Sequence, residues 1–100
     1  MDLRDQFKAK IISATEHCYE IGYSPNIFKQ MIEVNHPVEV GKKLVTSGEL
    51  QHGIKELAKL DQLELTIESI MLEPMFKELF SEQELAAAKW RLDDVRKHHA

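Results

Sequence analysis

The chain has little of what small disulfide-linked or turn-rich folds require. Its only cysteine is Cys18, so no internal disulfide can form, and thiolates alone cannot build a zinc site. Four glycines and three prolines punctuate 100 residues, and this scarcity favours helices over a β fold with many turns. No apolar run approaches the roughly 20 residues that a membrane-spanning helix needs. Residues 1–5 are charged and lack the apolar core of a secretory signal, so we expect a cytoplasmic protein without a membrane segment.

Basic residues are also too few for a nonspecific nucleic-acid binder. The formal net charge is −4, which disfavours contact with a phosphate backbone. Eight acidic and only two basic residues lie between Glu56 and Glu84, whereas basic side chains gather at Lys42 and Lys43 and near the C-terminus. Apolar residues make up 43% and charged residues 30%, which indicates a globular chain rather than a disordered one.

Apolar residues recur at intervals of three and four along most of the chain, which predicts helices. Helices are predicted over residues 2–21, 25–34, 37–47, 49–60, 61–73 and 81–98, with a short apolar turn over 75–80. Because the connections are short, successive helices should be neighbours in space. The fold prediction is one all-α domain over residues 1–100, a compact bundle of five to six helices. Its long N- and C-terminal helices pack on each other and around the short middle helices.

Local signals mark the ends of these helices. Gly22 stands where a C-terminal cap is expected, and Pro37 is suited to the first turn of the helix that it begins. Ser81 and Glu84 have the spacing of a capping box, in which each side chain accepts from the other residue's backbone N–H. Gly41 lies on the inner face of its helix and predicts the close approach of another helix.

The candidate residues for catalysis and metal binding do not have the pattern of an active site or a metal site. Ser13, His17 and Glu20 share one helical stripe, but a serine in mid-helix has no free N–H groups nearby to form an oxyanion hole. Two Glu-x-x-His pairs have the spacing of di-iron bundles, but their helices are too short for that architecture. These pairs are Glu33/His36 and Glu49/His52. Cys18 lies in an apolar stripe and is interpreted as a buried, unreactive thiol. We therefore expect no enzyme, no cofactor and no metal.

Acidic and aromatic side chains point instead to recognition of a protein partner. Asp61, Glu64 and Glu68 follow the three-and-four spacing of one helical face, which would dock on a basic surface of a partner. The alternative is an ordinary solvated face. Tyr23 and Trp90 belong to a set of large side chains that is hard to place entirely inside so small a core, and these residue types are enriched at interfaces. The rest of the set is Tyr19, Met75 and Phe76.

The last helix has a second, outward face that would pair with a helix of a partner. Ala86 and Trp90 begin this face, and Asp93 and Lys97 extend it. The partner would be another protein or a second copy of this chain. The alternative is that Trp90 packs over the edge of its own core.

A helix-turn-helix interpretation is the alternative function. The second and third predicted helices are short and closely joined, and the third carries Lys42, Lys43 and Thr46, which would face phosphates and bases. The absence of arginine from that helix and the acidic balance of the chain weigh against nucleic acid as the partner.

Several segments resemble a small bacterial helical domain of unknown function. They are GYSPNIFKQM at 22–31, VEVGKKL at 38–44, LTIE at 65–68 and FKELF at 76–80, with Gly53, Leu57, Leu60 and Asp61 between them. That domain occurs alone or appended to larger proteins, some of them nuclease-related, and the resemblance covers about residues 22–92. It implies a prokaryotic accessory domain and brings no catalytic residue or ligand. Our hypothesis is a non-enzymatic protein-interaction module, an adaptor or regulator of a prokaryotic nucleic-acid-processing or defence system.

Overall fold

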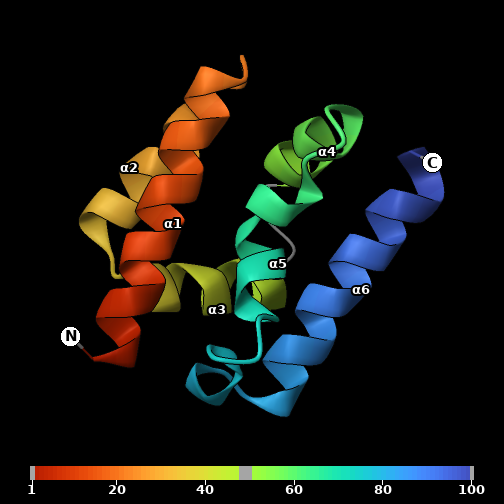
Figure 1. The fold of residues 1–100 in the computed structure, drawn as a ribbon. Coiled ribbons are helices and arrows are strands. Elements are labelled where there is room, and N and C mark those ends of the chain that lie inside the picture. Colours follow the sequence, from red (N-terminus) through yellow and green to blue (C-terminus); the bar gives the residue numbers. More distant parts are fainter. Residues whose placement is uncertain (1, 48–50, 100) are drawn as a thin grey trace.

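The fold is described from a computed structural model, which places residues 2–47 and 51–99. These residues form six α-helices and two 3₁₀ turns and contain no strand, which confirms the all-α prediction (Figure 1). None of the helices in these ranges combines the length and apolar character needed to cross a membrane. The elements are α1 (Leu3–Glu20), α2 (Asn26–Val34), α3 (Pro37–Ser47), α4 (Gln51–Lys59), η1 (Leu63–Leu65), α5 (Ile67–Met71), η2 (Lys77–Leu79) and α6 (Glu82–His99).

The two long helices lie on opposite flanks of the molecule, with α3, α4 and α5 between them, whereas α2 lies beside α1 on its far side from α6 (Figure 1). Helix α6 packs on α3, α4 and α5, and α1 packs on α3, α5 and η1. The long helices therefore frame most of the short ones, as the sequence predicts. The expectation that they also pack along each other is wrong, because α3 and α5 fill the space between them.

Phe7 lies at the centre of the main core. Its side chain is fully buried, and the rings of Phe76 and Phe80 meet it edge-on at centroid distances of 5.2 and 5.3 Å. These contacts hold the segment around η2 against α1, because edge-to-face ring pairs add to the free energy gained by burial. Phe76 is thus a core residue and not surplus surface, whereas Met75 is half exposed. A smaller apolar cluster of Ile54, Leu92 and Val95 joins α4 to α6.

The predicted ends of α1 and α6 are confirmed in atomic detail. Gly22 has a φ of +94°, which allows the Tyr23 N–H to donate to the Cys18 carbonyl at 2.9 Å and closes α1 with a Schellman-type cap. At the start of α6, the Ser81 N–H donates to the Glu84 carboxylate at 2.8 Å. The Glu84 N–H donates to the Ser81 hydroxyl at 3.1 Å, which completes the capping box.

Helix α3 begins at Pro37 and passes close to α5, both as predicted. The ring of His36, just before the helix, accepts a hydrogen bond from the Val38 N–H at 3.2 Å through Nδ1. A Cβ atom at Gly41 would lie 3.1 Å from the sulfur of Met71, so even the smallest side chain at this position would require Met71 to shift by a few tenths of an ångström. The glycine therefore permits the close crossing of the two helices.

The predicted fifth helix is broken into a turn and a shorter helix. Asp61 has a φ of +57°, a conformation that aspartate adopts more readily than most residues, and it lies just past the end of α4. It closes α4, because the Gln62 N–H donates to the Leu57 carbonyl at 2.8 Å, and it does not cap the start of the next helix. The cap of α5 is Thr66, whose hydroxyl accepts from the Ser69 N–H at 3.1 Å. Because η1 intervenes, residues 61–68 do not share one helical face.

Candidate docking surface

The predicted acidic stripe does not form, because Glu68 is a core residue. Only 3% of Glu68 is exposed, and its Oε2 atom accepts from Nε of Arg91 at 2.8 Å. Arg91 is also buried, and its NH1 group donates to the Leu44 carbonyl at 3.1 Å. The prediction that Glu68 lies on an exposed acidic face is therefore wrong, although Glu68 is among the residues that line the cavity described below. The residue joins α5 to α6, and Arg91 joins both to α3.

A sequence signal for this buried pair does exist in the last helix. Ala88, Leu92 and Val95 form the inward stripe of α6, and Arg91 lies three residues after Ala88 on the same face. An arginine inside an apolar stripe needs a buried acceptor, because an unpaired buried charge is very costly. The spacing alone does not indicate which of the many acidic residues supplies the acceptor.

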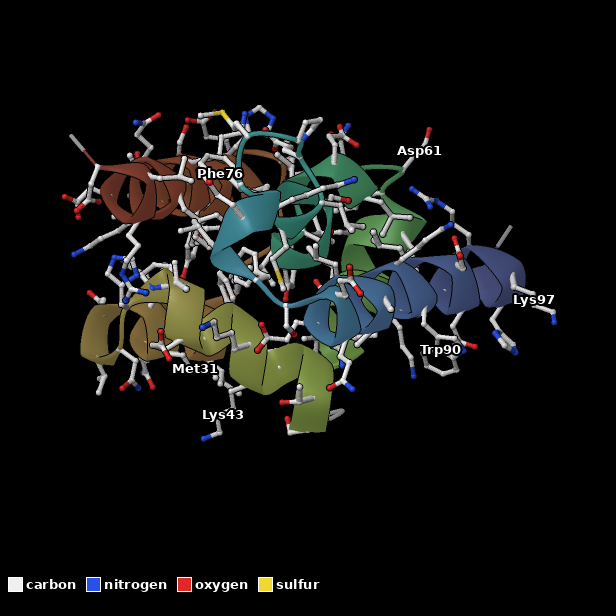
Figure 2. The ribbon with its side chains drawn as sticks, turned by 90° about the horizontal axis from the view of Figure 1, so that it is seen from below. Met31, Lys43, Asp61, Phe76, Trp90 and Lys97 are labelled. Atoms are coloured by element: carbon white, nitrogen blue, oxygen red, sulfur yellow. The ribbon has the colours of Figure 1, made fainter. Side chains whose placement is uncertain are left out.

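The other predicted partner-binding residues lie at separate places. Asp61 and Glu64 are exposed beside η1, and Tyr23 is half-buried after α1. Trp90 is 63% exposed on α6, so it does not pack over the core edge. Figure 2 shows Asp61 and Trp90 pointing to opposite sides of the molecule. These residues therefore do not form one surface, and their binding roles stay predictions.

A cavity of about 320 Å³ lies where the end of α1 meets the start of α2, α4 and α5. Its walls are mostly apolar, and it reaches the surface. It also lies beside the boundary between the two apolar clusters of the core, since Ile54 and Ile67 belong to different clusters and both line it. Other lining residues include Cys18, Tyr23 and Ile27. A volume of this size is at the lower end of the range for ligand-binding pockets, roughly 300–1,000 Å³.

Two polar groups of this cavity are held in their neutral forms. Burial raises the pKa of the Cys18 thiol, so Cys18 resists ionisation, and only 3% of the residue is exposed. Burial also raises the pKa of the Tyr23 hydroxyl, and the charges of Cys18, Glu56 and Tyr19 act in the same direction. At neutral pH, Cys18 and Tyr23 therefore present uncharged groups to the cavity, whereas Glu68, which also lines it, is paired with Arg91.

Helix α2 carries apolar side chains on its outer face as well as its inner one. Ile27 is 63% exposed and Val34 is 80% exposed, and the half-buried Met31 lies between them at helical spacing. We call Ile27, Met31 and Val34 the α2 outer stripe. The apolar spacing of residues 25–34 predicts that Ile27 points inward together with Phe28, Met31 and Ile32. For Ile27 this is wrong, because Ile32 and the half-buried Phe28 occupy the inner face. Five of the nine residues of α2 are large and apolar, more than one inner face can cover, and this excess is a signal for the stripe.

Contacts at the start of α2 fix the stripe relative to α1. The Tyr19 hydroxyl donates to the side-chain oxygen of Asn26 at 2.7 Å, and the ammonium group of Lys29 lies 5.6 Å from the centre of the Tyr19 ring. Because Ile27 also lines the cavity, the stripe and the cavity form a continuous apolar surface. A partner would meet a hollow at one end of α2 and exposed aliphatic side chains along the rest.

The residues considered for catalysis show no catalytic geometry. His17 lies 3.6 Å from the Glu20 carboxylate, both side chains are at least half exposed, and no hydrogen bond joins Ser13 to His17 in the part of the chain described. An open hollow of about 310 Å³ beside them has charged walls, with Lys10, Glu64 and Glu73 among the residues lining it. Glu33 is exposed, and Glu49 and the side chain of His52 lie outside what the structure describes. No group of three metal-ligating side chains occurs within the described ranges.

The face considered for nucleic acid is narrow. Lys43 and Thr46 are exposed, but Lys42 is half-buried, and α1, α5 and α6 all pack against α3. The Thr46 hydroxyl donates to the Lys42 carbonyl at 2.7 Å within its own helix. Figure 2 shows Lys43 directed away from the bundle on the same side as Trp90. The helix-turn-helix alternative stays a prediction.

Neither the protein-family models, the curated proteins nor the solved structures contain a match to this chain.

Proposed function

We propose that this chain is a non-enzymatic protein-interaction module that docks a partner on the α2 outer stripe and in the adjoining cavity. The observation that carries the proposal is the exposure of Ile27 and Val34, at 63% and 80%, on the helix next to the cavity. Single exposed apolar side chains are ordinary, but two on one helix face, with the half-buried Met31 between them and a hollow at one end, are typical of protein-binding surfaces.

The chemistry of this surface favours a partner segment with a large apolar anchor. An aliphatic or aromatic side chain would enter the cavity beside Cys18 and Tyr23, both of which are uncharged at neutral pH. The rest of the segment would lie along Met31 and Val34, with Lys29 and other polar residues at the rim. This arrangement has an apolar centre and a polar edge, as protein interfaces generally do.

A paired substitution in α2 tests the proposal without disturbing the core. Ile27→Glu places an acid in the first turn and Val34→Lys places a base in the last, so both charges suit the helix dipole and the fold should persist. We expect the immobilised chain to capture a specific protein from an extract of its host, and the double variant to lose that protein. Leu60→Lys, at another exposed apolar position, is the matched control and should retain it.

Two further results decide whether α2 and the adjoining cavity form the docking surface. In the complex of purified partner and wild-type chain, alkylation of Cys18 should slow, because the anchor fills the cavity that this residue lines. If the α2 variant and Leu60→Lys capture the same proteins in equal amounts, the stripe is not the docking surface. The narrower hypothesis of an adaptor or regulator in nucleic-acid processing or defence rests on the resemblance described above, and the identity of the captured protein tests it.

A further inference from the structure

The outward face of α6 has the spacing of a helix that pairs with another helix. Its exposed residues alternate at intervals of three and four, which is the heptad pattern of a coiled-coil seam. They are Gln83, Ala86, Trp90, Asp93 and Lys97. The large exposed side chain at the centre of this seam is Trp90, 63% accessible, and its nearest seam neighbour toward the N-terminus is the small Ala86. Figure 2 shows Trp90 directed away from α1 and the rest of the bundle.

Charge is distributed unevenly along the same helix. The first turn carries Glu82 and Glu84, and the last turn carries Arg96 and Lys97. Asp93 and Asp94 lie one turn before these bases, and Arg96 is 3.7 Å from the Asp93 carboxylate. Two parallel copies would place acid beside acid and base beside base. Two antiparallel copies would bring the acidic end of each helix to the basic end of the other. The charge pattern is therefore complementary to itself in one orientation only.

We propose that two copies of this chain associate through antiparallel α6 helices, with each Trp90 covering Ala86 of the partner subunit. This register follows from the seam, because the small alanine leaves room for an indole ring. It also brings Gln83 opposite Asp93 of the partner subunit and Glu82 near Arg96 of the partner subunit. The surface is separate from the α2 outer stripe, so the dimer does not depend on the function proposed above.

The expected dimer is weak and reversible. One helix pair with two tryptophans at its centre buries an area at the small end of protein interfaces, below about 1,200 Å². We expect a Kd on the order of 10–100 μM, since few residues besides Trp90 are suited to act as hot spots. Lys89 would face its own copy across the two-fold axis, which limits the affinity further.

Trp90 is the only tryptophan of the chain, so its fluorescence reports this interface directly. Sedimentation equilibrium of the full chain between about 5 μM and 1 mM should show a shift from monomer to dimer. Over the same range, the emission of Trp90 should move to shorter wavelength as the ring leaves water. Trp90→Ala should weaken association by about tenfold or more, because truncating a central aromatic anchor removes most of the contact.

A charge exchange distinguishes the antiparallel arrangement from others. Glu82→Arg and Arg96→Glu should each weaken the dimer severalfold, because each puts like charges together at both ends. The double variant Glu82→Arg/Arg96→Glu should restore association. In a parallel dimer, Glu82 would face Glu82 and Arg96 would face Arg96, so neither single change would weaken association. The double variant would then show no recovery relative to the single variants. Lys8→Glu, at an exposed position on α1, controls for the change in net charge.

Three results would overturn the proposal. The first is a chain that stays monomeric at 1 mM. The second is a dimer that survives Trp90→Ala, or that Ile27→Glu/Val34→Lys abolishes, because association would then use another surface. The third is quenching of Trp90 by a single-stranded oligonucleotide without self-association, which would assign this face to nucleic acid. Circular dichroism of each variant confirms that a loss of pairing is not a loss of fold.

Discussion

Replacing Arg91 with methionine should be among the most damaging single changes in this chain. Methionine retains much of the apolar stem but removes the guanidinium group, which donates to Glu68 at 2.8 Å and to the Leu44 carbonyl at 3.1 Å. The side chains of both ion-pair partners are no more than 6% exposed, so little water reaches Glu68 to replace the lost donors. The variant leaves a carboxylate buried without its cation.

Breaking a buried ion pair on one side costs about 3–5 kcal/mol, against a total stability of about 5–15 kcal/mol for a domain of this size. With an unfolding entropy of about 2 cal/mol/K per residue, Arg91→Met should lower the Tm by about 15–25 °C. Thermal and guanidinium unfolding, followed by circular dichroism at 222 nm, measure both quantities. Arg4→Met is the matched control, because Arg4 pairs with Glu39 at 3.4 Å while both side chains are about half exposed. It should cost less than about 1 kcal/mol.

The double variant Glu68→Leu/Arg91→Met completes the test. It replaces both charges with apolar side chains, so no ion is left unpaired, and it should be more stable than Arg91→Met by about 2 kcal/mol or more. The reasoning is refuted if Arg91→Met costs no more than Arg4→Met. It is also refuted if the double variant loses as much stability as Glu68→Leu and Arg91→Met lose separately when added together.

Three further predictions concern other buried groups. Burial, followed by the charges of Arg4 and Lys8, lowers the pKa of His36, so the unfolded chain takes up a proton first as the pH falls. Stability should therefore decline as the pH falls below about 6.5. His36→Asn keeps an acceptor for the Val38 N–H but cannot titrate, so it should flatten this dependence. Urea unfolding midpoints between pH 7.5 and 5.5 measure the effect. Gly41→Val should lower the stability of the fold by about 1–3 kcal/mol in the same unfolding assay, because a Cβ at this position already lies 3.1 Å from the sulfur of Met71. This effect should outweigh the better helix propensity of valine. An unchanged urea midpoint would contradict the close crossing of α3 and α5. The Cys18 thiol should react with a thiol reagent about a hundredfold or more slowly in the native chain than in denaturant, and similar rates would show that it is not buried.

The features that the sequence predicted correctly depend on neighbours along the chain. The capping box at Ser81 and Glu84 joins residues three apart, and Gly22 needs only the positive φ that closes its own helix. Such signals can be identified from a few adjacent residues in the sequence. The inward stripe of α1 is equally local, since Phe7 and Ile11 are one helical turn apart.

The features that the sequence did not predict depend on distant neighbours. Glu68 and Arg91 are 23 residues apart, and the Leu44 carbonyl is 47 residues from Arg91, so no local pattern joins them. Spacing suggested a surface stripe for Glu68 because the break at η1 could not be seen. In α2, apolar residues cover so much of the helix that tertiary packing decides which side is buried, and Ile27 was therefore assigned to the wrong face.

The buried ion pair also determines how α6 presents Trp90. Successive residues on a helix point about 100° apart, so the hydrogen bonds from Arg91 to Glu68 and to the Leu44 carbonyl fix the rotation of α6 and direct Trp90 outward. Apolar residues could supply comparable stability at these positions, but they lack directional bonds. We therefore expect Glu68→Leu/Arg91→Met to stay folded while its α6 dimer weakens severalfold, as measured by sedimentation equilibrium and Trp90 emission. A double variant that is as stable as the wild type and pairs equally well would show that apolar packing alone sets the rotation of α6.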